Sequence, residues 1–246
     1  MKISILPNKT KQLEKIEKRF INDSLVMGST NGLKKQINED SVGYCITKKS
    51  LRICIADGHW GTQASKFITK SLLNPMFHFP VTKIQSRQIT EKLEHMLYKK
   101  LKKHMMDEEK NFSPEASFIA IEISNNTLLV TSYGDCRMLV ANKGKLKFQI
   151  KMTRTWLGVF SYLGLRKRIS VKNAIQFKKI KLKKNDIVIL FTDGVDECIY
   201  EKPTISFKKI ALYSNNSTPH ATFNFIFKKI FEYGAEDNAS LVIYQH

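Results

Sequence analysis

Acidic residues recur at the ends of apolar, strand-like runs of this sequence. They are Glu39, Asp40, Asp57, Asp135, Asp193 and Asp237. A single acid at the end of a strand is ordinary turn chemistry. Several carboxylates that share one end of a sheet would repel one another, and some would stay protonated unless a cation lay between them. The pattern therefore predicts a divalent-cation site, with a satisfied turn carboxylate as the alternative for each acid.

The types of donor indicate which cation to expect. Carboxylate oxygens are the ligands that magnesium and manganese prefer, whereas zinc sites usually include cysteine or histidine. The cysteines are Cys45, Cys54, Cys136 and Cys198, and they form no CxxC pair. We therefore expect buried thiols, without a zinc site or a disulfide framework.

The elements that must position these acids alternate between strands and helices. Apolar and β-branched runs predict strands at 24–29, 41–47, 51–57, 117–123, 127–133, 137–142, 145–150, 174–182, 186–193 and 240–245. Apolar residues at helical spacing predict helices from Gly61 up to Pro75, at 89–105 and at 221–234. Residues 10–19 are interpreted as a short surface helix or lead-in.

Turn signals between the runs suggest how the strands pair. The short connection KKS (48–50) predicts a hairpin of 41–47 with 51–57. The turns between the four runs of 117–150 predict one antiparallel meander. Strands in both halves of the chain, with helical blocks between them, indicate an α+β sandwich with sheets inside and helices outside.

Charge and composition limit the partners. The 246 residues carry a formal net charge of +19, which suggests an acidic partner. Only seven of the 41 basic residues are arginine, and lysine lacks the planar fork that reads bases and clamps phosphates. We therefore expect a lysine-rich coat and no nucleic-acid partner. No apolar stretch approaches the roughly 20 residues of a membrane helix, and the N-terminus lacks the apolar region of a secretory signal, so we expect a cytoplasmic protein without membrane contact.

The run ICIADGHWG (53–61) resembles the DGHxG motif of the metal-dependent serine/threonine protein phosphatases of type 2C, the PPM family. Other stretches resemble the remaining motifs of that family, in the same order: KKQINEDSVGYC, TLLVTSYGDCRMLVANKGK, NDIVILFTDGVDECI and GAEDNASLVIYQ. Together the motifs span residues 35–244. The resemblance implies a four-layer α-β-β-α sandwich of two mostly antiparallel sheets flanked by helices. It also implies a single domain over 1–246, with a lead-in at 1–22 and a reduced flap region at 151–173.

The resemblance assigns the inner metal ligands. Asp57 would bridge two divalent cations, magnesium or manganese, and the carbonyl of Gly58 would bind one of them. Asp193 and Asp237 would complete the inner protein ligands. Such a pair of cations lowers the pKa of a water molecule, so that hydroxide is available near neutral pH to attack phosphorus.

Further acids and an amide surround these ligands in the family. Glu39 and Asp40 match residues that hold metal-bound water and the surrounding shell. Asp135 matches an acid that contributes to a third metal in some members. Asn238 matches a residue that orients the terminal loop.

Two residues match catalytic positions. His59 corresponds to the general acid that protonates the leaving alkoxide, and its unperturbed pKa of about 6.5 suits that task. The alternative is a histidine that packs beside the metal for structure only. Lys35 stands where many members have an arginine that binds the substrate phosphate, so the planar fork is lost. A shift of one residue to Lys34, or help from Arg137 or Arg154, would replace it.

The resemblance implies hydrolysis of phosphoserine and phosphothreonine in proteins, opposing a serine/threonine kinase. The expected partners are phosphorylated protein substrates and a cognate kinase, and we expect a monomer. Cys136 replaces the serine of the family's Gly-Asp-Ser-Arg motif, and the flap region is short. These departures, with Lys35, keep an alternative open: a catalytically weak relative that binds a phosphoprotein or kinase as a regulator.

Overall fold

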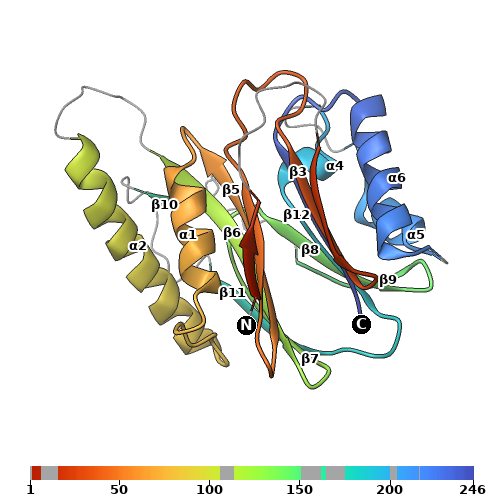
Figure 1. Cartoon of the computed structure of the whole chain (residues 1–246), viewed down its shortest axis with the longest axis horizontal. Coiled ribbons are helices and arrows are strands. Elements are labelled where there is room, and N and C mark those ends of the chain that lie inside the picture. The colour runs from red at the N-terminus through yellow and green to blue at the C-terminus, as the bar shows by residue number, and fades with distance from the viewer. Residues whose placement is uncertain are drawn as a thin grey trace. The chain divides into compact units, whose positions relative to one another are not determined.

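The computed structural model describes residues 2–6, 16–105, 114–150, 162–164, 175–199, 204–215 and 217–246, without the side chains of residues 20 and 103–105. The chain forms two compact units that interleave along the sequence. Unit 1 comprises Met1–Ile5, Gly43–Cys136 and Met152–Lys181, and unit 2 comprises Leu6–Val42, Arg137–Lys151 and Leu182–His246. Each unit is built on one β-sheet with helices packed against it (Figure 1).

The sheet of unit 1 has the strand order β1-β4-β5-β6-β7-β11, and β10 pairs with β6. Its strands are β1 (Lys2–Ile5), β4 (Ser41–Ile46), β5 (Leu51–His59), β6 (Glu115–Ser124), β7 (Thr127–Tyr133), β10 (Leu163–Gly164) and β11 (Gln176–Lys181). β4 and β5 are hydrogen-bonded neighbours, which confirms the predicted hairpin. Along β5 and β6, Ile53 lies opposite Ile121 and Ile55 opposite Ile119, so β-branched side chains meet across the strands.

Two helices pack on this sheet: α1 (Gln63–Leu73) against β5 and β6, and α2 (Lys83–Met105) against β10 and β11. Ile68 and Leu72 of α1 join Leu93 and Leu97 of α2 in one buried apolar cluster with the sheet. This burial is what the helical spacing of apolar residues predicts for both segments.

α2 begins at Lys83, ahead of the predicted start at residue 89. The sequence Thr-x-x-Gln at 82–85 caps it. The Gln85 N–H donates to Thr82 Oγ1 at 3.2 Å, and the Val81 N–H donates to Gln85 Oε1 at 2.9 Å. These bonds satisfy backbone donors that the first turn of a helix leaves without partners, so capping extends the helix beyond its apolar stripe.

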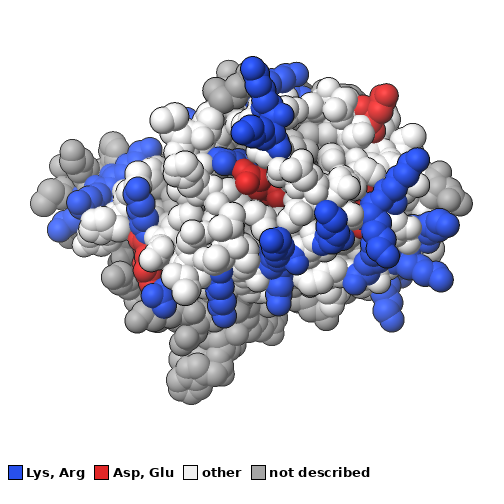
Figure 2. All heavy atoms as spheres, turned by 90° about the horizontal axis from the view of Figure 1, so that it is seen from below, with Lys and Arg blue, Asp and Glu red and all other residues white. Residues whose placement is uncertain are grey.

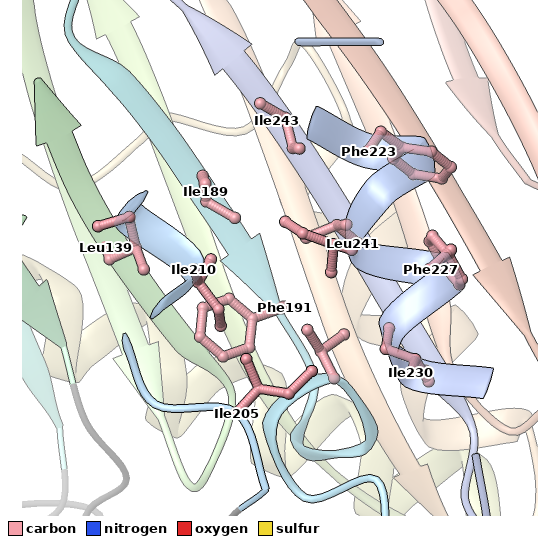
Figure 3. Packing of buried hydrophobic residues seen from close by; sticks show 14 of the residues in the cluster. Leu139, Ile189, Phe191, Ile205, Ile210, Phe223, Phe227, Ile230, Leu241 and Ile243 are labelled. Carbon is pink, nitrogen blue, oxygen red and sulfur yellow. The ribbon is translucent and has the colours of Figure 1, made fainter. Parts of the chain in front are cut away.

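The sheet of unit 2 has the strand order β2-β3-β13-β12-β8-β9. Its strands are β2 (Glu17–Asn22), β3 (Leu25–Thr30), β8 (Arg137–Asn142), β9 (Lys145–Ile150), β12 (Ile187–Phe191) and β13 (Ala239–Gln245), and its helices are α4 (Asp193–Asp196), α5 (Phe207–Tyr213) and α6 (Pro219–Glu232). α6 has Thr218 as its N-cap and proline at its first position, a favoured start. Figure 3 shows Phe223, Phe227 and Ile230 of this helix against the apolar residues of the sheet.

Two expectations are wrong, one about the pairing of strands and one about the segment that precedes β3. The four runs of 117–150 do not form one meander, because β6 and β7 belong to the sheet of unit 1 while β8 and β9 belong to that of unit 2. Gly134, with φ of +95°, lies in the connection between β7 and β8, a conformation that glycine adopts easily. Residues 17–22 form strand β2 and no helix, because they pair with β3; residues 10–15 lie outside the described part of the chain.

All four cysteines are buried and free, as predicted. Burial raises the pKa of Cys54 to about 12. On the face seen in Figure 2, basic side chains far outnumber acidic ones, in line with the net charge. Among the helices that the structure describes, none is both long and apolar enough to cross a membrane.

Candidate functional site

The motif residues Asp57, Gly58 and His59 lie within strand β5 and not after it. Asp57 pairs with Ser117 of β6, Gly58 with Ala116, and β5 ends only at His59. Because side chains alternate along a strand, Asp57 and His59 point to the same face of the sheet. The chain then turns through Trp60 and Gly61, which have φ of 62° and 125°, so the DGHWG sequence ends a strand and makes a sharp turn.

Asp57 and His59 meet Asp135, which follows β7. Asp57 is 5% exposed and Asp135 is 2% exposed. One ligand atom of each of the three residues lies within 4.8 Å of the others. Two buried carboxylates at this distance favour a cation between them. Unit 1 therefore brings together three residues that the sequence singled out, and the two carboxylates could hold a divalent cation.

A residue that the sequence did not single out joins this group. Tyr162 donates its hydroxyl hydrogen to Asp135 Oδ2 at 2.7 Å. Its ring lies against the His59 ring, with centroids 4.4 Å apart and planes tilted by 48°. Tyr162 thus contacts both the acid and the imidazole. It falls in the expected flap region, of which only 162–164 is described, and no spacing rule marked it.

The loop that carries Asp135 is fixed to strand β6 by its neighbour. The Cys136 N–H donates to Ser117 Oγ at 3.2 Å, and the two side chains are 3.1 Å apart at Oγ and Sγ. Ser117 is the residue opposite Asp57 in the sheet. Cys136 in the GDCR sequence therefore packs in the interior and holds Asp135 near Asp57, where its thiol is 0% exposed.

The remaining predicted site residues lie in unit 2, where Asn238 joins two of the motifs. Its Oδ1 accepts from the Glu39 N–H at 2.9 Å, and its Nδ2 donates to the carbonyls of Ile37 at 3.1 Å and Asn31 at 3.3 Å. Asn238 is 4% exposed. The amide side chain therefore holds the loop that carries Glu39 and Asp40 against the start of β13.

A hydrogen bond joins Asp40 to the threonine that precedes Asp193. Asp40 Oδ2 accepts from Thr192 Oγ1 at 2.9 Å, and Thr192 directly precedes Asp193 at the start of α4. A side chain at Gly194 would place its Cβ 2.1 Å from the Asn238 carbonyl oxygen. The Thr-Asp-Gly sequence therefore needs glycine so that α4 can approach the backbone of Asn238.

The two lysines of the first motif contact acids of the last one. Lys35 Nζ lies 3.2 Å from Asp237 Oδ1, and Lys34 forms an ion pair with Glu236. The Lys35 side chain is 40% exposed and that of Asp237 is 18% exposed. Lys35 thus lies beside a predicted metal ligand, and its predicted contact with the substrate phosphate stays a prediction.

Arg137 does not fit the suggested role of a phosphate contact. It is 1% exposed, its Nε lies 3.1 Å from Asp196 Oδ1, and a second guanidinium nitrogen pairs with Glu197. Both acids follow Asp193 along the chain. Arg137 therefore fixes α4, and with it the backbone of Asp193, to strand β8. Arg154, the other suggested arginine, lies outside the described residues.

Comparisons with known proteins confirm the fold. A bacterial serine phosphatase has a TM-score of 0.71 at 15% identity, over 94% of this chain and 98% of the other. The serine/threonine phosphatase Stp1 from Staphylococcus aureus has a TM-score of 0.70 at 15% identity, over 98% of each chain. RsbX, solved in complex with magnesium, has a TM-score of 0.63 at 15% identity, over 94% and 99%. At these identities the likeness establishes the type 2C phosphatase fold.

A family model gives the sequence-level match. The model described as stage II sporulation protein E, SpoIIE, matches residues 47–246. Among curated proteins, no sequence matches this chain. The matched region includes the strand-end motifs of Asp57, Asp135, Asp193 and Asp237.

Proposed function

Because the chain belongs to the SpoIIE family and has the fold of the type 2C phosphatases, we propose that it hydrolyses phosphoserine and phosphothreonine in proteins with the help of divalent cations. The observation that carries the proposal is the group of Asp57, His59 and Asp135 at the end of β5, with ligand atoms within 4.8 Å of one another. In its cellular role the enzyme would oppose a serine/threonine kinase.

The reaction moves the phosphoryl group to water. The water gives up a proton and its oxygen bonds to phosphorus, while the bond from phosphorus to the serine or threonine oxygen breaks and the leaving oxygen takes up a proton. Two magnesium or manganese ions, when bound, would supply hydroxide near neutral pH and neutralise charge on the phosphoryl oxygens. We propose that Asp57, Gly58, Asp193 and Asp237 hold them, with Glu39 and Asp40 around them and Asp135 available to a third ion.

His59 is the proposed general acid. Its imidazole shares a face of the sheet with Asp57, and the Tyr162 ring packs against it at 4.4 Å. This contact limits the ring to few orientations, which a proton donor needs because transfer requires hydrogen-bond reach to the leaving oxygen. His59 itself is half-buried.

The test is a pair of assays with a matched control. We expect hydrolysis of a phosphothreonine peptide and of p-nitrophenyl phosphate with manganese or magnesium, and loss of both with excess EDTA. Asp57→Asn should abolish turnover and leave the protein folded, because it removes a ligand charge. Asp23→Asn, the same change at an exposed turn, should keep normal rates. Full turnover in EDTA by protein without detectable metal would refute the proposal.

One observation favours the second candidate, a regulator that binds a phosphoprotein or kinase without efficient turnover. The cation that should contact the substrate phosphate is a lysine, and it already pairs with Asp237. A regulator of this kind would bind the phosphothreonine peptide with manganese present and release no phosphate. Peptide binding measured beside phosphate release therefore separates the two candidates.

A further inference from the structure

Two adjacent lysines face two adjacent acids in unit 2. Lys34 pairs with Glu236, and Lys35 Nζ lies 3.2 Å from Asp237 Oδ1. In the outer pair the Lys34 side chain is 65% exposed and that of Glu236 is 23% exposed. The inner pair is more sheltered, at 40% for Lys35 and 18% for Asp237.

The backbone around the inner pair is held on both sides. The Lys35 carbonyl accepts from Asn31 Nδ2 at 2.8 Å, and the Leu33 N–H donates to the Ala235 carbonyl at 2.7 Å. Gly32, with φ of +68°, lets this loop lie close to the Asp237 backbone, since a Cβ there would be 2.4 Å from the Asp237 carbonyl oxygen. The fold itself therefore brings the backbone of Lys35 close to that of Asp237.

We infer that Lys35 is an internal counter-cation of Asp237, whose ammonium group a divalent cation must displace from the carboxylate. The inference rests on the proposed function, in which Asp237 is a metal ligand. A carboxylate oxygen that accepts from an ammonium has less electron density for a metal, and the two positive charges repel. Lysine suits this role better than arginine, because it is a point charge on a flexible stem and does not form the bidentate fork that resists displacement.

Displacement has a consequence for the substrate. With the metal in place, the ammonium of Lys35 leaves Asp237 and becomes available to an anionic oxygen nearby, such as one of the phosphoryl group. The lysine then changes partner with metal occupancy: it pairs with the acid when the cation is absent and with phosphate when the cation is present. This reconciles its predicted phosphate contact with its position beside Asp237.

The test measures manganese binding to the full chain by titration calorimetry at neutral pH. Lys35→Met removes the charge and keeps the length of the side chain. We expect it to bind manganese about two- to five-fold more tightly than the wild type, which corresponds to the loss of a partly exposed ion pair. The matched control is Lys34→Met, which removes the same charge one residue away and should leave the affinity unchanged.

A second variant localises the effect. In an Asp237→Asn background, the gain from Lys35→Met should be smaller than in the wild type, because the ion pair is already absent. Thermal unfolding in EDTA checks that each variant is folded. Unchanged or weaker manganese binding by Lys35→Met overturns the inference, and so does an equal gain in Lys34→Met, which would be a general effect of surface charge.

The outcome also separates this inference from the proposed enzyme. Tighter manganese binding by Lys35→Met in a protein that never releases phosphate supports the counter-cation and refutes the enzyme. Phosphatase activity with the same manganese affinity in all variants supports the enzyme and refutes the counter-cation. If no variant binds manganese, both are refuted.

Discussion

Replacement of Arg137 by methionine tests whether the buried ion pairs hold the α4 turn. Arg137 is one of the largest fully buried side chains, and its guanidinium contacts both Asp196 and Glu197. Methionine keeps much of the volume and removes the charge. The two carboxylates, with side chains only 9% and 14% exposed, would then lose their cation.

The expected loss of stability is large because charges stay buried. Removal of one partner of a buried ion pair typically costs about 3–5 kcal/mol, most of it from the charge left behind. A domain of ordinary stability has about 5–15 kcal/mol in total, so the variant should still fold at low temperature. We also expect α4 to be displaced locally, and Asp193 with it, because this helix carries both Asp193 and Asp196. The Asp196 carbonyl accepts the backbone N–H groups of Thr204 and Ile205, so these contacts would change too.

Urea unfolding followed by circular dichroism measures the stability, and calorimetry measures manganese affinity. The matched control is Arg52→Met in unit 1. Arg52 is also buried, pairs with Glu122 at 2.5 Å and donates to the Phe77 carbonyl at 2.7 Å. The Arg52→Met variant should lose a similar amount of stability and keep the manganese affinity of the wild type. Arg137→Met should lose both. A loss below about 1 kcal/mol, or the same manganese affinity as the wild type, would refute the positioning role.

Two more predictions concern the imidazole and its neighbour. His59→Ala should lower the rate on a phosphothreonine peptide by roughly 10²–10⁴-fold, the usual contribution of a general acid, and much less on p-nitrophenyl phosphate, whose leaving group needs little protonation; equal losses in the two assays would indicate a structural histidine. Tyr162→Phe keeps the ring on His59 and removes a hydroxyl that orients Asp135 without adding a positive charge. We therefore expect weaker manganese binding, with the same ratio of rates on the two substrates. Tyr162→Ala should weaken manganese binding and also change the ratio of rates, because the ring is lost. A wild-type ratio in both variants would show that the ring does not position His59.

The positions of most strands could be predicted because the period of two and the β-branched composition are local properties. The hairpin of β4 and β5 followed from a short connection, and β12 and β13 followed from their continuous apolar runs. The partners of the strands could not be predicted in the same way. The pattern of β7 and β8 says which face of each strand is apolar, but not that the three residues 134–136 between them carry the chain from one sheet to the other. The apolar stripe does not predict the start of α2 either, because Thr82 and Gln85 extend the helix by hydrogen bonds of their side chains.

The candidate site also has a part that the sequence predicts and a part that it does not. The types and order of its acids can be predicted, because each motif is a strand end of a few residues. The contacts that set their chemistry join segments far apart in the chain, as when Asn238 holds the loop of Glu39 or Tyr162 reaches Asp135. Lys35 shows that a residue's own motif does not identify all of its contacts. Its place in the motif suggests a partner on the substrate, whereas the fold supplies an acid, Asp237, about 200 residues further along the sequence. A lysine that must give up this acid before it can bind phosphate has a different effect on the reaction from an arginine that binds phosphate at all times, because its charge first opposes the metal and only afterwards assists the substrate.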